Sequence, residues 1–257
     1  MRTFPLSSTA RTREVVRHEL RRRRAAVVAR LELPGSLVRI TLGGEDLEGF
    51  TSLGPEDHVK LFFAGSEGVV GRDYTPSEFR ALGASSGPEL DIDFVVHGTD
   101  GPATAWASAA VDGDELEFGG PRGSRLAPTG FRNALLIADP AGLPALRRWV
   151  RAFAGDPITH VVLFGGAEAE FLDETERATV LLQVVEPGQD LLATVEAQDV
   201  DGDTFVWAAG EATALVPVRR HLKALGLPKE NRSLHGYWKR GEAGLDHHAP
   251  LDPSDPD

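Results

Sequence analysis

Two patterns of hydrophobic and polar positions divide the chain near residue 128. Before that point, short β-rich segments of often alternating character are separated by Gly, Pro or Asp. These segments are residues 25–33, 37–44, 58–63, 90–98 and 114–120. Such a series predicts an antiparallel barrel or sandwich, interrupted by one short helix within "GPATAWASAA". Residues 11–24 predict a short charged helix ahead of it.

Beyond residue 132 the pattern alternates between apolar runs and segments of helical spacing. The expected strands are residues 133–139, 160–166, 179–185 and 204–210, and the expected helices are 143–153, 167–177 and 211–226. Strands that alternate with helices indicate a parallel α/β sheet. We therefore expect two domains, residues 1–128 with an Arg-rich leader at 1–24, and residues 129–246. The Pro- and Asp-rich tail, 247–257, is expected to be disordered.

Composition excludes several classes of protein. The chain of 257 residues has no Cys and a net charge of −12, which argues against disulfides, thiolate metal sites and general nucleic-acid binding. It has no run of about eighteen apolar residues and no apolar signal core, so we expect a cytoplasmic protein without a membrane span. The histidines lack metal-ligand spacing, so no metal site is predicted.

The charge is distributed unevenly. Residues 1–30 hold nine Arg against two Glu, a net +7, and the remainder carries −19. The run "RRRR" at 21–24 has two interpretations, an anion-binding arm or a solvated segment whose arginines neutralise the acidic body. The second interpretation is favoured.

The segment "RDYTP" and a glycine-rich turn are the candidate chemistry of the first half. If residues 72–75 are extended, Arg72 and Tyr74 share a face and Thr75 points the other way. Gly98, Gly101 and Pro102 stand at a helix start, where free N–H groups and the helix dipole favour a phosphate. Together these residues suit a planar, phosphate-linked cofactor, although ordinary turn chemistry explains the same residues.

The second half offers two strand ends where ligands of parallel sheets bind, at residues 135–146 and 205–215. No G-x-G-x-x-G is present, and two unremarkable strand–turn–helix connections remain an alternative. Glu168 and Glu170 follow a strand at the place where related folds meet the ribose 2′ position. Carboxylates there favour NADH over NADPH.

Six blocks of the sequence resemble the siderophore-interacting protein family, flavin-dependent ferric-siderophore reductases related to ferredoxin reductases. The blocks cover residues 37–50, 57–63, 72–76, 90–124, 207–222 and 236–243. The resemblance implies a six-stranded antiparallel Greek-key barrel that binds FAD, followed by a parallel α/β domain that receives NADH or NADPH. The implied activity is electron transfer from NAD(P)H through FAD to the Fe(III) of a siderophore, by a monomer.

The resemblance also implies roles for individual residues. Arg72 would pair with the pyrophosphate, Tyr74 would pack on the isoalloxazine, and Thr75 would reach the polar edge of the ring. The remaining cofactor contacts would be His97, Gly101, Pro102, Ala103, Thr104, Trp106 and Glu211. A basic triad would bind the anionic ferric siderophore, with Lys60, Arg220 and Lys239 as its members; Arg219 and Lys223 are alternatives to Arg220. No catalytic side chain is implied.

Two segments depart from the family pattern. Ser77 stands where the family usually has an arginine, and Arg80 is a candidate to replace it. Pro140 and Ala141 stand where the family tends to have Glu and Thr, in the turn that faces the nicotinamide nucleotide. Two other functions therefore stay open: a flavin- or chelate-binding protein without NAD(P)H turnover, and a general flavin or quinone reductase.

Overall fold

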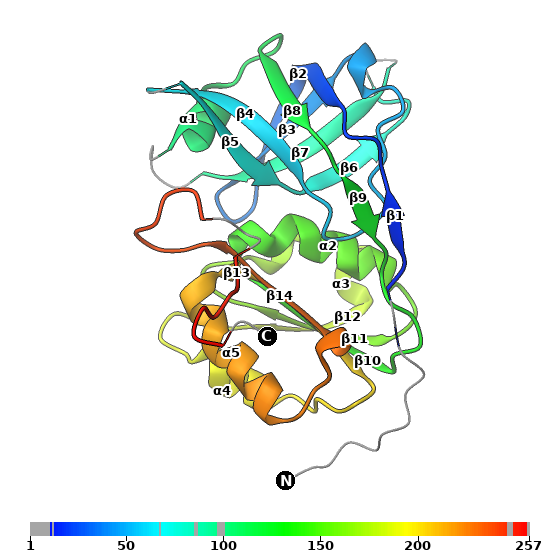
Figure 1. The fold of residues 1–257 in the computed structure, drawn as a ribbon, viewed down its shortest axis with the longest axis vertical. Helices are drawn as coiled ribbons and strands as arrows, with labels where there is room; N and C mark the ends of the chain where they lie inside the picture. Colours follow the sequence, from blue (N-terminus) through cyan, green and yellow to red (C-terminus); the bar gives the residue numbers. More distant parts are fainter. Residues whose placement is uncertain are drawn as a thin grey trace. The chain divides into compact units, whose positions relative to one another are not determined.

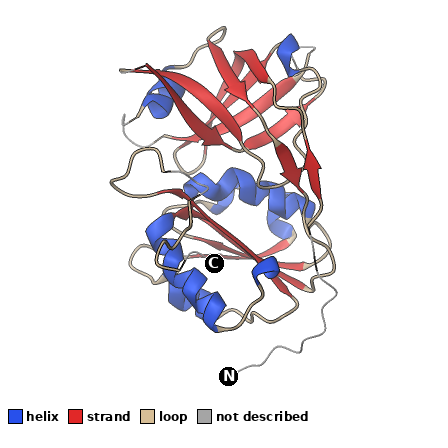
Figure 2. Cartoon of the chain, in the orientation of Figure 1, coloured by secondary structure: helices blue, strands red, loops and turns tan. Residues whose placement is uncertain are grey.

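The computed structural model describes residues 11, 13–66, 68–84, 87–96, 101–245 and 249–255. They form two compact units, one of residues 14–126 and the other of the residues from 127 onward together with Arg11 and Arg13. Strands dominate the first unit, and the second unit combines strands with most of the helices (Figures 1 and 2). The predicted cofactor contact His97 lies outside the described residues.

The first unit is built on a seven-stranded antiparallel sheet of order β5-β4-β8-β2-β3-β7-β6. Its strands are β2 (Arg22–Leu33), β3 (Leu37–Gly43), β4 (Val59–Gly65), β5 (Gly68–Tyr74), β6 (Pro76–Arg80), β7 (Glu89–Val95) and β8 (Glu115–Gly119). β5 and β6 stand at opposite ends of the sheet, yet only Thr75 separates them along the chain. One bent segment thus supplies both edges of the sheet, which confirms the predicted antiparallel barrel. The sheet has seven strands where six were expected, because the bend at Thr75 divides this segment into β5 and β6.

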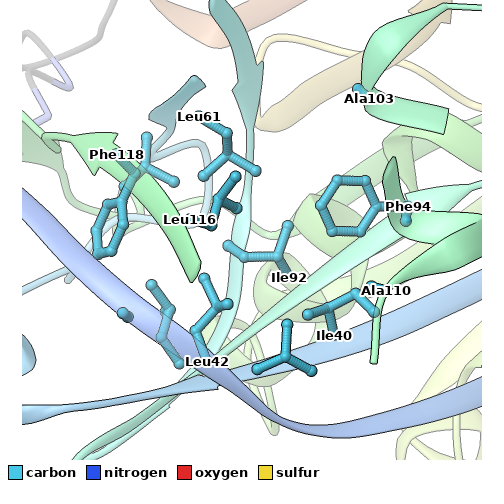
Figure 3. Close-up of a cluster of buried hydrophobic side chains, with 14 of the residues drawn as sticks. Ile40, Leu42, Leu61, Ile92, Phe94, Ala103, Ala110, Leu116 and Phe118 are labelled. Atoms are coloured by element: carbon cyan, nitrogen blue, oxygen red, sulfur yellow. The ribbon is translucent and has the colours of Figure 1, made fainter. Parts of the chain in front are cut away.

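Alternation along these strands fills the barrel with apolar side chains. In β7, Leu90, Ile92 and Phe94 are fully buried, and residues of β3, β4 and β8 meet them in the same cluster (Figure 3). Burial of one such side chain stabilises the fold by about 1.5–3 kcal/mol. Helix α1 (Pro102–Ala109), the short helix predicted within this half, packs Ala103 and Ala107 against the same cluster.

The helix predicted over residues 11–24 is wrong. Val15–Arg17 forms β1, which pairs with β9 (Gly123–Arg125), and β2 already begins at Arg22. The arginine run alternates in exposure as a strand does, with Arg23 buried and its neighbours exposed. Arg22 and Arg24 form ion pairs with Glu117 of β8, so two arginines of the run neutralise acidic side chains of the barrel.

The second unit contains the predicted parallel sheet, of order β12-β11-β10-β13-β14. Its strands are β10 (Asn133–Ala138), β11 (Ile158–Leu163), β12 (Val180–Val184), β13 (Thr204–Glu211) and β14 (Arg232–Trp238). Its α-helices are α2 (Leu143–Ala152), α3 (Glu174–Ala178), α4 (Leu191–Glu196) and α5 (Ala212–Ala224). Because the strand order reverses between β10 and β13, their carboxyl ends form the switch point at which open α/β sheets bind ligands.

Short 3-10 helices complete both units. They are η1 (Glu45–Leu47), η2 (Pro140–Gly142), η3 (Ala169–Phe171) and η4 (Lys229–Asn231). The acidic helix expected over 167–177 is split into η3 and α3, because Asp173 caps α3 through a reciprocal pair of hydrogen bonds with Glu176.

Residues 249–255 differ from the disordered tail that the composition predicts. Asp252 is buried and pairs with Arg220 of α5. Asp255 pairs with Arg219 and Lys223 of the same helix. The tail is acidic and this face of α5 is basic. Ion pairs therefore hold the tail against the helix, although the tail has few apolar residues to bury.

Candidate functional site

The predicted cofactor segment lies at the bend that closes the barrel. Arg72 pairs in register with Leu61 and Tyr74 with Val59, so Arg72 and Tyr74 share one face of β5, as predicted. Thr75 occupies the bend itself and is buried. Before the bend the segment pairs with β4, and after it the segment pairs with β7. These pairings hold the side chains of the bend on a rigid element.

Tyr74 belongs to an aromatic cluster. Its ring centroid lies 4.5 Å from that of Phe94 and 6.4 Å from that of Phe63. Trp106 of α1 lies 5.6 Å from Phe63 and 5.8 Å from Phe94. Burial raises the pKa of the Tyr74 phenol, against a smaller opposing effect of the Arg72 charge, so the phenol is neutral at physiological pH. Neutral aromatic rings of this kind suit a planar, apolar ligand surface.

Arg72 carries a charge that the described residues leave unneutralised. Its guanidinium donates to the carbonyl of Gly71 at 2.8 Å, and no carboxylate among the described residues forms an ion pair with it. A half-buried arginine without a carboxylate partner suits a phosphate, because charge-assisted hydrogen bonds would then satisfy its remaining donors.

Helix α1 presents a second anion-binding feature in the same unit. Gly101 is its N-cap with φ of 103°, and none of the described side chains caps the helix. A Cβ atom built on Gly101 would meet no atom within 4 Å, so a ligand can approach the backbone there. The N–H groups of Ala103 and Thr104 face the helix start, where a phosphate binds favourably. Arg72, the aromatic cluster and α1 therefore fit FAD.

Arg80, the candidate to replace the arginine that is missing at Ser77, is engaged within the barrel wall. It forms ion pairs with Asp91 and Glu89 of β7. Ser77 donates to Asp93, which also forms a two-bond ion pair with Arg39. The hypothesis that Arg80 compensates in the cofactor site therefore stays a prediction, and it would require Arg80 to leave these carboxylates. Arg39 and Arg80 neutralise buried carboxylates of the barrel wall.

A buried carboxylate occupies the switch point of the α/β unit. Asp139 follows β10, is 1% exposed, and accepts hydrogen bonds from the backbone N–H groups of Ala141 and Gly142. It also accepts from the backbone N–H of Glu211 and from the indole of Trp238, at 2.9 and 2.7 Å. Burial raises the pKa of Asp139 to about 6, although these hydrogen bonds favour the ionised form.

Glu211 has a clear local role in the structure. Its carboxylate accepts from the N–H of Ala214 and so caps α5, and it also accepts from the N–H of Arg240. It therefore ties the end of β13 to the segment that follows β14. Its assignment as a cofactor contact stays a prediction.

Each of the three cations predicted to bind substrate has a carboxylate partner. Lys60 pairs with Asp73 on the adjacent strand β5, and Lys239 pairs with Glu242, each at 2.7 Å. Arg220 pairs with Asp252, also at 2.7 Å. Lys60 belongs to the barrel unit and the other two to the α/β unit. Lys239 follows the carboxyl end of β14, whereas Arg220 lies about 12 Å along α5 from the end of β13.

Known proteins resemble this chain over most of its length. The siderophore-interacting protein family matches residues 131–241, and the siderophore-interacting FAD-binding domain matches residues 26–70 and 65–125. An NADPH-dependent ferric-chelate reductase of Escherichia coli K12 is 30% identical, with 91% of this chain and 99% of that protein aligned. The chain belongs to the siderophore-interacting protein family.

Solved structures agree with this membership. A siderophore utilization protein from T. fusca is 33% identical with a TM-score of 0.81, covering 92% of this chain and all of the other. A ferredoxin reductase of carbazole 1,9a-dioxygenase, 19% identical with a TM-score of 0.62, covers 85% of this chain and 70% of its own and shares the fold. The ferredoxin-reductase-like fold class is confirmed.

Two residues of the site were missed by sequence reasoning. Asp139 and Trp238 lie 99 residues apart, and only the parallel sheet brings them together. A signal existed for Asp139, because an Asp directly after a buried strand and before Pro is typical of a helix N-cap. Nothing in the sequence pairs Trp238 with it.

Proposed function

We propose that this member of the siderophore-interacting protein family is an FAD-dependent NAD(P)H oxidoreductase that reduces ferric siderophores and releases Fe(II). The observation that carries the proposal is the occurrence, within one barrel, of an arginine and a helix start for which the described residues supply neither a carboxylate partner nor a side-chain cap. The aromatic cluster at Tyr74 and Trp106 adds a surface for a flat ring. These features together suit a dinucleotide flavin better than any smaller anion.

The residues of the chain bind and orient the cofactor. Arg72 and the N–H groups of Ala103 and Thr104 would hold the two phosphates, and Tyr74 would pack on the ring, with Thr75 at its polar edge. When bound, FAD supplies the conversion of a two-electron donor into one-electron reduction, which Fe(III) requires. Hard oxygen ligands hold Fe(III) tightly and Fe(II) weakly, so the chain needs no iron ligand of its own.

Lys60, Arg220 and Lys239 are proposed to attract the anionic ferric siderophore. The chain as a whole is acidic, so an anion requires local positive charge near the reacting edge. All three side chains are paired in the structure, and an arriving carboxylate or catecholate would compete with Asp73, Asp252 and Glu242 for them. The exposed pairs of the lysines cost little to open.

The donor nucleotide is proposed to bind at the carboxyl ends of the parallel strands. Glu168 and Glu170 are exposed beyond the end of β11, where carboxylates would repel a 2′-phosphate and bond a 2′-hydroxyl. This feature favours NADH, whereas the Escherichia coli relative is named NADPH-dependent. A comparison of kcat/KM for the two nucleotides, in the parent and in a Glu168→Lys, Glu170→Lys variant, decides between them.

A spectrum of the purified chain tests the whole proposal. Flavin absorbance should bleach on addition of NADH or NADPH without oxygen, and return when a ferric siderophore is added. Flavin that neither nucleotide bleaches would indicate a binding protein or a different donor. Bleached flavin that quinones reoxidise and ferric siderophores do not would indicate a general quinone reductase.

We also expect a monomer that acts in the cytoplasm, which light scattering and cell fractionation test. None of the helices within the described residues is long and apolar enough to cross a membrane.

A further inference from the structure

Asp139 connects three elements at the switch point of the α/β unit. Its Oδ1 accepts from the turn after β10, at 2.9 Å from Ala141 N and 3.2 Å from Gly142 N. Its Oδ2 accepts from Glu211 N of β13 and from Trp238 Nε1 of β14. Four N–H groups therefore converge on one carboxylate, and both of its oxygens are needed as acceptors.

The surroundings of Asp139 are built to accommodate this carboxylate. A Cβ atom on Gly210 would lie 2.5 Å from the Cγ atom of Asp139, so only glycine fits beside it. Glu211, whose backbone N–H binds Asp139, is the titratable residue in contact with it. Its carboxylate accepts from Ala214 N and Arg240 N instead. The turn residues at 140–142 and Gly165, which follows β11, bring no titratable side chain to Asp139.

We propose that Asp139 is a positioning residue for the nicotinamide nucleotide, because its ionised carboxylate fixes the Trp238 indole and the Glu211 turn at the strand ends. The inference rests on the proposed function, in which NAD(P)H binds at this edge. Asp139 acts through these two groups: Trp238 offers a flat ring at the edge of the sheet, and Glu211 anchors Arg240 next to it.

The arrangement makes nucleotide binding depend on pH. Burial raises the pKa of Asp139 to about 6, within the range that cells and assays reach. A protonated carboxyl keeps one full acceptor oxygen and turns the other into a donor, so at least one of the four N–H groups loses its partner. We expect Trp238 and the Glu211 turn to loosen, and the nucleotide to bind more weakly, as the pH falls through about 6.

Calorimetric titration of the flavin-loaded chain with NAD⁺ between pH 5 and 8 tests this inference. NAD⁺ is the probe because it lacks the 2′-phosphate, which titrates near pH 6 itself. In the parent, Kd should rise about tenfold from pH 7.5 to pH 5, the effect of losing one charge-assisted hydrogen bond. In Asp139→Asn, Kd should be about tenfold higher at pH 7.5 and no longer vary with pH.

The Trp238→Phe variant tests whether Asp139 positions the nucleotide through the Trp238 indole or only stabilises the fold. It keeps the aromatic ring and removes one donor that stabilises the ionised carboxylate, so the midpoint of the pH dependence should move up by about one unit. Asp190→Asn is the matched control, since Asp190 caps α4 but is exposed. It should leave Kd and its pH dependence unchanged.

The outcomes distinguish the inference from the proposed function. A parental Kd that does not vary with pH, or a Trp238→Phe midpoint equal to the parental one, would overturn the inference and leave the proposed function intact. Absence of NAD⁺ and NADP⁺ binding at every pH would overturn the donor assignment and the inference together. Should Asp139→Asn fail to fold, the Trp238→Phe midpoint decides.

Discussion

The two units differ in whether a carboxylate of the chain itself binds the N–H groups at a helix start. Helix α1 of the barrel begins at Gly101 without a side-chain cap, and Arg72 in the same unit has no carboxylate partner among the described residues. In the α/β unit the turn that leads into α2 is capped by Asp139, and α5 is capped by Glu211. The barrel leaves its anion-binding groups open, whereas the α/β unit satisfies them with its own carboxylates.

This difference predicts a tightly bound cofactor in the barrel and a rapidly exchanging one in the α/β unit. Open donors on a rigid barrel gain hydrogen bonds when a phosphate arrives, which favours tight and lasting binding. A strand edge whose donors are already satisfied gains less from a phosphate. We therefore expect FAD to stay bound to the barrel through many turnovers, and the nicotinamide nucleotide to exchange rapidly.

The largest effect is expected at Asp139, whose burial costs stability. Its folded pKa of about 6 exceeds the ordinary value of 3.8, so the ionised carboxylate destabilises the folded state by about 3 kcal/mol above pH 6. That cost disappears as the pH falls from 6 to about 4, because the folded chain takes up the proton first. From pH 7 to pH 4 the parent should thus gain roughly 2 kcal/mol of unfolding free energy relative to Asp139→Asn.

Urea unfolding followed by tryptophan emission measures this difference, because Trp149 and Trp207 are fully buried in the α/β unit. Identical pH dependence in parent and variant would mean that the carboxyl is not held in an unfavourable environment.

Arg72→Ala probes the open donors of the barrel. Loss of a charge-assisted contact to a phosphate should weaken FAD binding by about 1.5–3 kcal/mol, or roughly ten- to a hundredfold in Kd. Arg30→Ala removes the same charge from β2, where Arg30 is exposed and 3.6 Å from Glu32, and should retain FAD like the parent. Equal FAD affinity in all three proteins would remove Arg72 from the site.

Thr104→Glu gives α1 the acidic first turn that it lacks. A carboxylate there favours the helix by about 0.3–1 kcal/mol through the dipole, so the flavin-free chain should unfold at an equal or slightly higher temperature. FAD should nevertheless bind several-fold more weakly, since the new charge repels its phosphates. Thr104→Gln is the neutral control. A variant that binds FAD as tightly as Thr104→Gln would show that no phosphate lies at this helix start.

The smallest effect is expected for the paired lysines. Lys60→Glu combined with Lys239→Glu should raise KM for an anionic ferric chelate by a factor of about three at low salt, and less at high salt. Flavin reduction by the nucleotide should stay near parental. Lys229→Glu is the control, because Lys229 precedes the amino end of β14 whereas Lys239 follows its carboxyl end. An unchanged KM at low ionic strength would place the substrate elsewhere.

Local patterns in the sequence determined both units of the fold. Alternation predicts the barrel strands because each strand buries one face, and the apolar runs of the second half predict parallel strands covered on both faces. The segment "RDYTP" was recognisable because its chemistry lies within five consecutive residues. The charged stretch 11–24 was misread, since an arginine that pairs with a neighbouring strand looks the same in sequence as one on a helix surface.

Tertiary structure alone decided which charges are satisfied. Arg80 lies near the cofactor segment in sequence but pairs with Asp91 and Glu89, whereas Arg72 has no carboxylate partner in the part of the chain that the structure describes. Asp139 meets Trp238 only because β10, β13 and β14 are brought into register over 99 residues of chain. Hydrogen bonds and ion pairs act over a few ångströms in space, so they depend on which distant segments the fold places side by side.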